Sequence, residues 1–309
     1  MQAVKLIHNP NAGDEQHSRD TLLAAIESAG YACDYINLKK KGWKKRDLSC
    51  DFLIVAGGDG TVRKVVLQLL DRKEKRGQPI GLIPLGTANN IARSLALPES
   101  AEDIVALCKE GRTRRFDVGR IIGLDKASYF LEGIGFGVFP NLINAMKAKK
   151  SEMANASAEE SLRTALEELL RLIDTYEGRE CHLEIDGIDH SGRFLLVEVM
   201  NTPSIGPNLR LNPMADPGDG EIEIIIIPED QREKFHDYLC DKMAGKEEAF
   251  SFSALKGKDI RITWEGRHLH VDDKLMKRKP PIALEIVLKP GLLDFLAAKD
   301  ASTEDEKAG

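Results

Sequence analysis

Short apolar runs alternate with amphipathic stretches over the first 125 residues. Residues 51–56 (DFLIVA) are apolar at almost every position, which is typical of a strand buried on both faces of a parallel sheet. Leu22, Leu23 and Ile26 share one face of a helix that Gly30 would end. The pattern predicts strands over 4–8, 31–38, 51–56 and 80–83, and helices over 18–29, 61–70, 89–95 and 102–109. Such strand and helix pairs indicate a doubly wound α/β domain with a parallel sheet.

Beyond residue 122 the pattern changes, because strands separated by turn residues dominate. The strands are expected over 127–133, 181–185, 193–201, 221–227, 259–264, 268–272 and 282–288. One long helix over 158–176 interrupts them, opened by a capping box of Ser157 and Glu160. We therefore expect an α/β nucleotide-binding domain over 1–122 and a β-sandwich-like domain over 123–309. The segment 290–299 is expected to pack back on the first domain.

Composition and charge narrow the class of protein. The 309 residues suit two domains, and no apolar run approaches the ~18 residues of a membrane-spanning helix. Residues 1–125 hold 20 Lys and Arg against 16 Asp and Glu, a net +4, whereas the rest of the chain carries −10. The basic half favours an anionic partner, but a pI of about 5.8 argues against nucleic acid. Five scattered Cys and a start without a signal core predict reduced thiols and a cytoplasmic location.

The motif Gly57-Gly58-Asp59-Gly60-Thr61 follows the predicted central strand and precedes a helix. Glycines there let the backbone approach a ligand closely, and amides at a helix start favour phosphate. Asp59 repels phosphate, so its presence makes sense if Mg²⁺ or its waters lie between them. A tight turn without a ligand is the simpler alternative, but ligands bind at this end of parallel strands.

Two further loops leave strands at the same edge of the predicted sheet. They are Asn9-Pro10-Asn11-Ala12-Gly13 and Pro84-Leu85-Gly86-Thr87-Ala88-Asn89-Asn90. Either could be an ordinary turn or helix cap by itself. Together the loops predict one anion-binding cleft. The chain lacks a P-loop, a protein-kinase catalytic set and a Gly-x-Ser-x-Gly elbow, which excludes those classes.

In order and spacing, these motifs resemble the diacylglycerol kinase catalytic-domain family, which includes soluble bacterial lipid kinases and is related to sphingosine kinases and NAD kinases. The resemblance extends through 115–119 (RFDVG), 213–220 (PMADPGDG) and 270–274 (HVDDK). It implies an ATP- and Mg²⁺-dependent kinase that acts on a lipid hydroxyl at a membrane surface, with ATP between a nucleotide domain and a lipid domain.

The resemblance also assigns residues. It implies that ATP is bound by Asn9, Pro10, Asn11, Ala12, Gly13, Gly57, Gly58, Asp59, Gly60, Thr61, Val62, Arg63, Thr87 and Asn89. Asp59, Thr87 and Asp117 would organise the catalytic Mg²⁺ and its waters. Asp219, with the carbonyls of Asp216 and Glu221, would hold a structural Mg²⁺. Asp272 would accept the proton of the acceptor hydroxyl, and Asp59 would act with it in catalysis.

The chain departs from the family pattern at Arg63, Asn90 and Lys274, where the family has Asn, Asp and Glu. Two alternatives therefore stay open: an NAD-kinase-like enzyme with a soluble acceptor, and a nucleotide-binding protein with altered catalytic residues. His268, His270 and Asp272 occupy alternate positions of the predicted strand 268–272 and therefore share one face of it. These residue types could bind a metal ion, but we favour a polar strand face as the interpretation. The basic loop 39–46 is either solvated or a contact for anionic lipid. Strand edges in the second domain would allow a homodimer.

Overall fold

The chain divides into two compact units, Met1–Phe116 with Gly291–Gly309, and Asp117–Pro290. The computed structural model describes residues 2–298 except 14–16, 73–76, 126–127, 150, 152–155, 206–208 and 247–251. The polar tail expected from Asp300 lies outside the described residues. We call the two parts unit 1 and unit 2.

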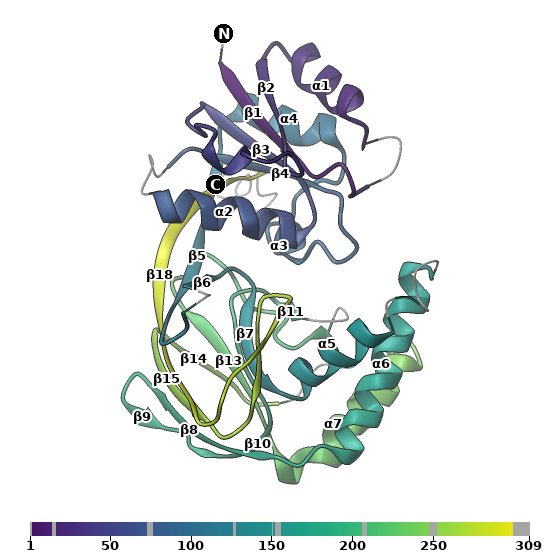
Figure 1. Cartoon of the computed structure of the whole chain (residues 1–309), viewed down its shortest axis with the longest axis vertical. Helices are drawn as coiled ribbons and strands as arrows, with labels where there is room; N and C mark the ends of the chain where they lie inside the picture. The colour runs from purple at the N-terminus through teal and green to yellow at the C-terminus, as the bar shows by residue number, and fades with distance from the viewer. Residues whose placement is uncertain are drawn as a thin grey trace, which may run out of the picture. The chain divides into compact units, whose positions relative to one another are not determined.

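Unit 1 contains a parallel sheet in the order β18-β4-β3-β1-β2 (Figure 1). Its strands are β1 (Ala3–His8), β2 (Ala32–Asn37), β3 (Phe52–Gly57), β4 (Ile80–Pro84) and the end of β18 (Ile282–Leu296). Every residue of β3 is buried, as its apolar sequence predicts. At the far end of β18, Phe295 pairs with Ile80. Thus the carboxyl ends of β1, β3 and β4 lie at one edge of the sheet.

Four helices accompany this sheet: α1 (Arg19–Ser28), α2 (Asp59–Arg72), α3 (Asn90–Ser94) and α4 (Ala101–Glu110). Helices α1 and α4 pack against each other on one face, and α2 packs on β3 (Figure 1). Ser18 and Ser100 cap α1 and α4 by accepting backbone N–H groups, each worth about 1 kcal/mol. Gly111 ends α4 in the left-handed conformation, which glycine adopts without strain.

Unit 2 is built mainly from antiparallel strands in the order β17-β16-β7-β10-β8-β15-β18, with β13 and β14 attached beside β10. The strands are β5 (Thr113–Ile122), β6 (Tyr129–Phe130), β7 (Gly133–Gly137), β8 (Arg179–Ile185), β9 (Ile188–Asp189), β10 (Gly192–Met200), β11 (Ser204–Ile205), β12 (Leu209–Arg210), β13 (Ile222–Pro228), β14 (Ala254–Gly257), β15 (Asp259–Trp264), β16 (His268–Val271) and β17 (Lys274–Lys277). The core includes the fully buried Trp264 against Phe136, whose ring centroids are 5.6 Å apart. In place of the strand expected over 127–133, β6 ends at Phe130 and β7 begins at Gly133.

The expectation of one helix in this part is wrong, because the structure has three: α5 (Val138–Ala148), α6 (Ala158–Thr175) and α7 (Arg232–Met243). Helix α6 begins with the predicted capping box. Helix α5 starts directly after β7 without a side-chain cap, so its apolar start resembles a continued strand. Helix α7 is mostly polar and buries only Phe235 and Leu239, which leaves too few apolar positions for a helical pattern.

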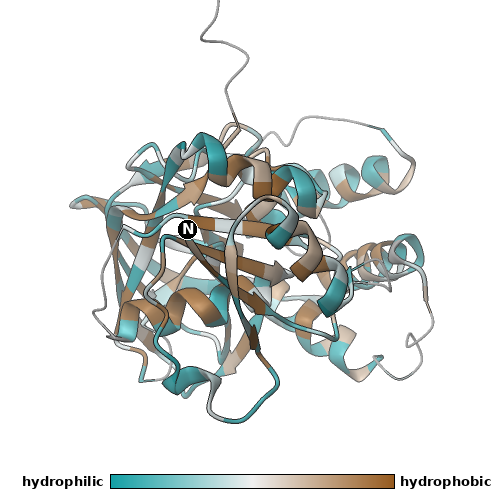
Figure 2. Ribbon diagram, turned by 90° about the horizontal axis from the view of Figure 1, so that it is seen from above, coloured by the Kyte–Doolittle hydropathy of each residue, from teal (hydrophilic) through white to brown (hydrophobic). Residues whose placement is uncertain are grey.

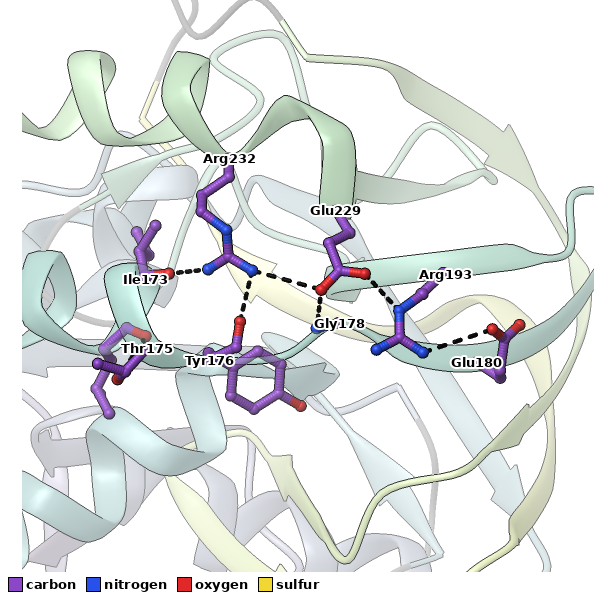
Figure 3. Close-up of polar contacts among 9 residues, drawn as sticks. Ile173, Thr175, Tyr176, Gly178, Glu180, Arg193, Glu229 and Arg232 are labelled. Atoms are coloured by element: carbon purple, nitrogen blue, oxygen red, sulfur yellow. Dashed lines mark hydrogen bonds and ion pairs between the residues drawn. The ribbon is translucent and has the colours of Figure 1, made fainter.

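An arginine connects the end of α6 to the start of α7 (Figure 3). The Arg232 guanidinium donates to the backbone carbonyls of Ile173 and Tyr176, at the carboxyl end of α6. Glu229 pairs with Arg232 and Arg193 and accepts the amide of Gly178 at 2.7 Å. These contacts satisfy carbonyls that a helix end leaves without partners, and a cation there complements the helix dipole.

Hydrophobic residues concentrate in the strands and on the inner sides of the helices, and hydrophilic residues on the outer sides (Figure 2). Among the helices that the structure describes, none is long and apolar enough to span a lipid bilayer.

Candidate functional site

The three predicted phosphate loops meet in unit 1. Gly58 and Gly86 approach so closely that a Cβ on Gly86 would lie 2.6 Å from the Gly58 Cα. Asn9 Nδ2 donates to Thr61 Oγ1 at 3.3 Å, which joins the first loop to the second. The Asn9 amide also donates to the Ala56 carbonyl at 3.0 Å. The expected grouping of the loops at one sheet edge is therefore present.

Helix α2 begins at Asp59, two residues earlier than expected, so the motif forms its first turn. The Gly58 carbonyl accepts the amides of Thr61 and Val62 at 2.7 and 3.2 Å, as a residue preceding a helix does. Amides at such a helix start carry partial positive charge and favour phosphate. Nothing lies within 4 Å of the place where a Gly60 Cβ would be, so this turn is open on that side.

Asp59 has a structural task that the sequence did not reveal. Its Oδ2 accepts the amide of Asn90 and its Oδ1 the amide of Ile91, both at 3.0 Å. The side chain is buried, at 8% exposure. The carboxylate of one phosphate loop thus caps helix α3, which follows the other. Because both carboxylate oxygens already accept amides, Asp59 is better suited to contact the water molecules bound to a metal ion than to coordinate the metal ion directly.

The other residues predicted to bind ATP differ in how exposed their side chains are. Thr61 and Val62 are buried in α2, and their amides already donate to the Gly58 carbonyl. Arg63 is half-buried, and Thr87 is exposed. Asn89 closes the β4–α3 loop on itself, because its side chain accepts the Gly86 amide and donates to the Gly86 carbonyl. Pro10, Asn11, Ala12 and Gly13 form the loop after β1, and Gly57 ends β3.

Asp272 lies in unit 2, in the turn between β16 and β17, and not within a strand as expected. Its backbone has a positive φ of 48°. Its Oδ1 accepts three successive amides, those of Leu131, Glu132 and Gly133, at 3.1, 2.9 and 3.3 Å. The carboxylate is therefore held in one place. Because the strand ends at Val271, the alternation of faces does not extend to Asp272 and Asp273.

A buried pair of side chains, His270 and Glu198, supports this turn. His270 Nδ1 lies 2.7 Å from the Asp272 carbonyl oxygen, and its Nε2 lies 2.9 Å from Glu198 Oε2. The two side chains meet over Gly135, which faces Glu198 on one neighbouring strand and His270 on the other. A Cβ on Gly135 would collide with both side chains. This glycine is thus needed for packing.

Burial raises the pKa of Glu198 against the opposing effect of His270. Burial alone would lower the pKa of His270, but the Glu198 carboxylate and the hydrogen bonds to Glu198 and Asp272 raise it above its ordinary value. Since Nδ1 must donate to a carbonyl, a further proton is shared between Nε2 and Glu198.

A small cavity of about 40 Å³ opens in front of Asp272. Its lining combines the polar Asp272 and His270 with the apolar Phe139, Leu142 and Ile143 of helix α5. His268, which was considered with His270 as a metal ligand, instead lies 3.3 Å from Asn141 Oδ1. Within the described part of the chain, no group of three or more His, Cys, Asp or Glu side chains is arranged to hold a metal ion.

Asp117 lies on β5 and belongs to unit 2, whereas Asp59 and Thr87 belong to unit 1. Its Oδ2 accepts the amide of Gly220 at 2.8 Å, and its own amide donates to the Pro217 carbonyl at 2.6 Å. Asp117 is thus joined to the turn expected to hold the structural Mg²⁺. Its role near a catalytic Mg²⁺ stays a prediction.

In that turn, Asp219 and Glu221 already face a cation. Lys256 Nζ lies 3.1 Å from Asp219 Oδ2 and 3.0 Å from Glu221 Oε2. Asp219 Oδ1 accepts the Glu221 amide, and the Asp216 carbonyl accepts the Asp219 amide. Lys256 thus already supplies a cation to these side-chain carboxylates, and the structural Mg²⁺ expected from Asp219 and the carbonyls of Asp216 and Glu221 stays a prediction.

Comparison with known proteins places these observations in a family. Residues 3–121 match the diacylglycerol kinase catalytic domain, and residues 144–297 match the YegS C-terminal NAD kinase beta sandwich-like domain. The chain belongs to the diacylglycerol kinase catalytic domain family. The diacylglycerol kinase of Bacillus subtilis is 28% identical over 249 residues, which are 74% of each chain.

Solved structures of two kinases share the fold with this member of the diacylglycerol kinase family. A diacylglycerol kinase from Bacillus anthracis matches with a TM-score of 0.71 and 22% identity, covering 96% of this chain and 97% of its own. An NAD kinase from Archaeoglobus fulgidus, solved in complex with ATP, matches with a TM-score of 0.52 and 14% identity over 95% and 93% of the two chains. The predicted family and fold class are confirmed.

Sequence reasoning missed Glu198 and Lys256 and assigned His270 only to a polar face. Glu198 left one signal, because it is the only charge in the otherwise apolar segment 194–200 (FLLVEVM). Lys256 left none, since its three carboxylate neighbours lie more than 30 positions earlier in the chain.

Proposed function

We propose that this protein is an ATP-dependent lipid kinase that transfers the γ-phosphate to a lipid hydroxyl. One observation carries the proposal: the glycine loops after β3 and β4 meet at Gly58 and Gly86, directly before the start of helix α2. Loops of this kind suit a polyphosphate, because backbone amides can approach it without side chains between. Family membership supports ATP as the phosphate donor.

The residues of unit 1 would bind and orient ATP. The start of α2 offers amides, and the half-buried Arg63 adds a cation beside them. The contact of Asp59 with the start of α3 fixes the positions of the two loops relative to each other before the nucleotide binds. Mg²⁺, which ATP brings, would neutralise phosphate charge during transfer. Phosphoryl transfer asks mainly for positioning and charge stabilisation, so a rigid pair of loops matters more than a reactive side chain.

Asp272 would act as the general base of unit 2. It accepts the proton of the acceptor hydroxyl as that oxygen forms a bond to the γ-phosphorus and the bond to the β-phosphate oxygen breaks, releasing ADP. Three amides on Oδ1 prevent the carboxylate from turning away. His270 and Glu198 hold the backbone of the same residue. The family has a Glu at the position of Lys274, which lies exposed at the start of β17. With Asp272 as the base, the proposed reaction does not need that Glu.

The lining of the cavity supports a lipid acceptor. Phe139 and Leu142 of helix α5 place apolar surface beside the carboxylate of Asp272. A substrate with a hydroxyl attached to a hydrocarbon chain matches this combination better than a dinucleotide does. At about 40 Å³ the cavity takes only a small group, so an acceptor would enter by parting α5 from the turn.

The test of acceptor class is transfer of radiolabelled γ-phosphate from ATP in two reactions, one with a total lipid extract and one with NAD. We expect a labelled lipid, which chromatography would identify, and no labelled NAD. Labelled NAD without labelled lipid would replace the proposal with an NAD-kinase-like activity. Tight ATP binding without transfer to either acceptor would favour a nucleotide-binding protein.

A further inference from the structure

In unit 2, Lys256 lies against the acidic turn formed by residues 216–221. Lys256 lies on β14 and pairs in register with Glu223 of β13. Its Nζ is 3.1 Å from Asp219, 3.0 Å from Glu221 and 3.7 Å from Glu223. Glu223 is fully buried, and neither of its carboxylate oxygens has a hydrogen-bond partner within the described residues. A buried carboxylate of this kind is costly unless a cation compensates it.

The turn that Lys256 holds is connected to Asp117. Gly220, between Asp219 and Glu221, donates its amide to Asp117 Oδ2 at 2.8 Å. Pro217 accepts the amide of Asp117 at 2.6 Å. If the carboxylates around Lys256 lost their cation, their repulsion would act directly on this turn. The ammonium group therefore stabilises both the turn and the position of Asp117.

We propose that Lys256 is the permanent cation of this turn, so that unit 2 needs no divalent metal there. The geometry supports this, because one Nζ lies within 4 Å of three carboxylates and compensates their charge. An ammonium has three donors, and Asp219 and Glu221 accept two of them. The inference concerns folding and metal dependence, so it stands independently of the kinase activity proposed above.

We predict that the stability of the Lys256→Met variant depends on a divalent metal ion, whereas the stability of the wild type does not. This substitution keeps the length and apolar stem of the side chain but removes its charge. Without the ammonium, three carboxylates face one another and suit Mg²⁺ or Mn²⁺, which prefer oxygen ligands. We expect Lys256→Met to unfold several degrees below the wild type in EDTA, and to regain most of that loss in millimolar Mg²⁺. The wild type should unfold at the same temperature in both buffers.

The matched control is Lys246→Met, which removes the same charge from unit 2 at an ion pair of an exposed lysine with Asp241. We expect almost no change there, because such pairs contribute little. The double variant Lys256→Met/Asp219→Asn should lose the metal response. Thermal unfolding without nucleotide, followed by circular dichroism, measures all four proteins.

Two results would overturn the inference. One is a wild type that Mg²⁺ stabilises as strongly as it stabilises Lys256→Met, since metal would then bind with the lysine in place. The other is a Lys256→Met protein that behaves like Lys246→Met in both buffers. If Lys256→Met does not fold, Mn²⁺ binding to the wild type decides the matter through paramagnetic broadening of signals around Gly220. Broadening there contradicts the proposal, and its absence, with a Lys256→Arg variant that folds normally in EDTA, supports it.

Discussion

Replacing Asp59 with Ala should destabilise unit 1 even when no nucleotide is present. The side chain is buried and accepts the amides of Asn90 and Ile91, both at 3.0 Å. A hydrogen bond to a charged group contributes about 1.5–3 kcal/mol. Two bonds that share one carboxylate are not fully additive, so we take the low end, about 3 kcal/mol in total. In domains of this size that corresponds to a fall in Tm of roughly 6–12 °C.

The assay for Asp59→Ala combines thermal unfolding with hydrogen exchange of the amides of Asn90 and Ile91. Those two amides should exchange about 100-fold faster, since 1.4 kcal/mol corresponds to a tenfold change. The matched control is Asp71→Ala, an exposed carboxylate near the other end of α2. Equal Tm values for the two variants, with unchanged exchange and lost ATP binding, would refute the structural role and assign Asp59 to the nucleotide alone.

Three further outcomes are expected. Gly86→Ala should lower the unfolding free energy by about 1–3 kcal/mol and weaken ATP binding, because its Cβ would lie 2.6 Å from the Gly58 Cα. Gly60→Ala has open space and should be neutral or stabilising. Equal ATP affinities of the two variants would contradict this. His270→Ala should lower the unfolding free energy by about 3–5 kcal/mol, and adding Glu198→Met should recover part of it, since the buried charge is then gone too; purely additive losses would argue against the pair. At neutral pH iodoacetamide should label only Cys240 in the folded protein, because it is exposed while burial raises the pKa of the other four thiols to about 11 or 12; mass spectrometry of native and unfolded samples counts the labels.

The α/β unit could be predicted in detail because its signals are local. A buried strand such as 52–57 is apolar throughout, and a glycine pair directly after it marks where the backbone must bend and approach a ligand. Parallel pairing then brings the loops after β1, β3 and β4 to one edge. By contrast, the amides that Asp59 accepts are 31 and 32 positions away, and no local pattern reports such a contact.

The second unit was harder to predict for the same reason. The pair of Glu198 and His270 forms only because Gly135, on the strand between them, leaves room for both. Alternation of His268 and His270 was visible in the sequence, but the end of β16 at Val271 was not. Helix α7 escaped prediction because its neighbours and not its own amphipathic pattern stabilise it.

The central claim, phosphoryl transfer with Asp272 as base, is tested most directly by the turnover of Asp272→Asn beside Asp273→Asn. The two residues are neighbours in one turn, but Asp272 is buried and held by three amides whereas Asp273 is exposed. Initial rates of labelled lipid formation, with ATP affinity measured separately, give the comparison. We expect Asp272→Asn to lose about 10²–10⁴-fold in kcat with ATP affinity unchanged, and Asp273→Asn to stay near the wild type. A fully active Asp272→Asn would contradict the account.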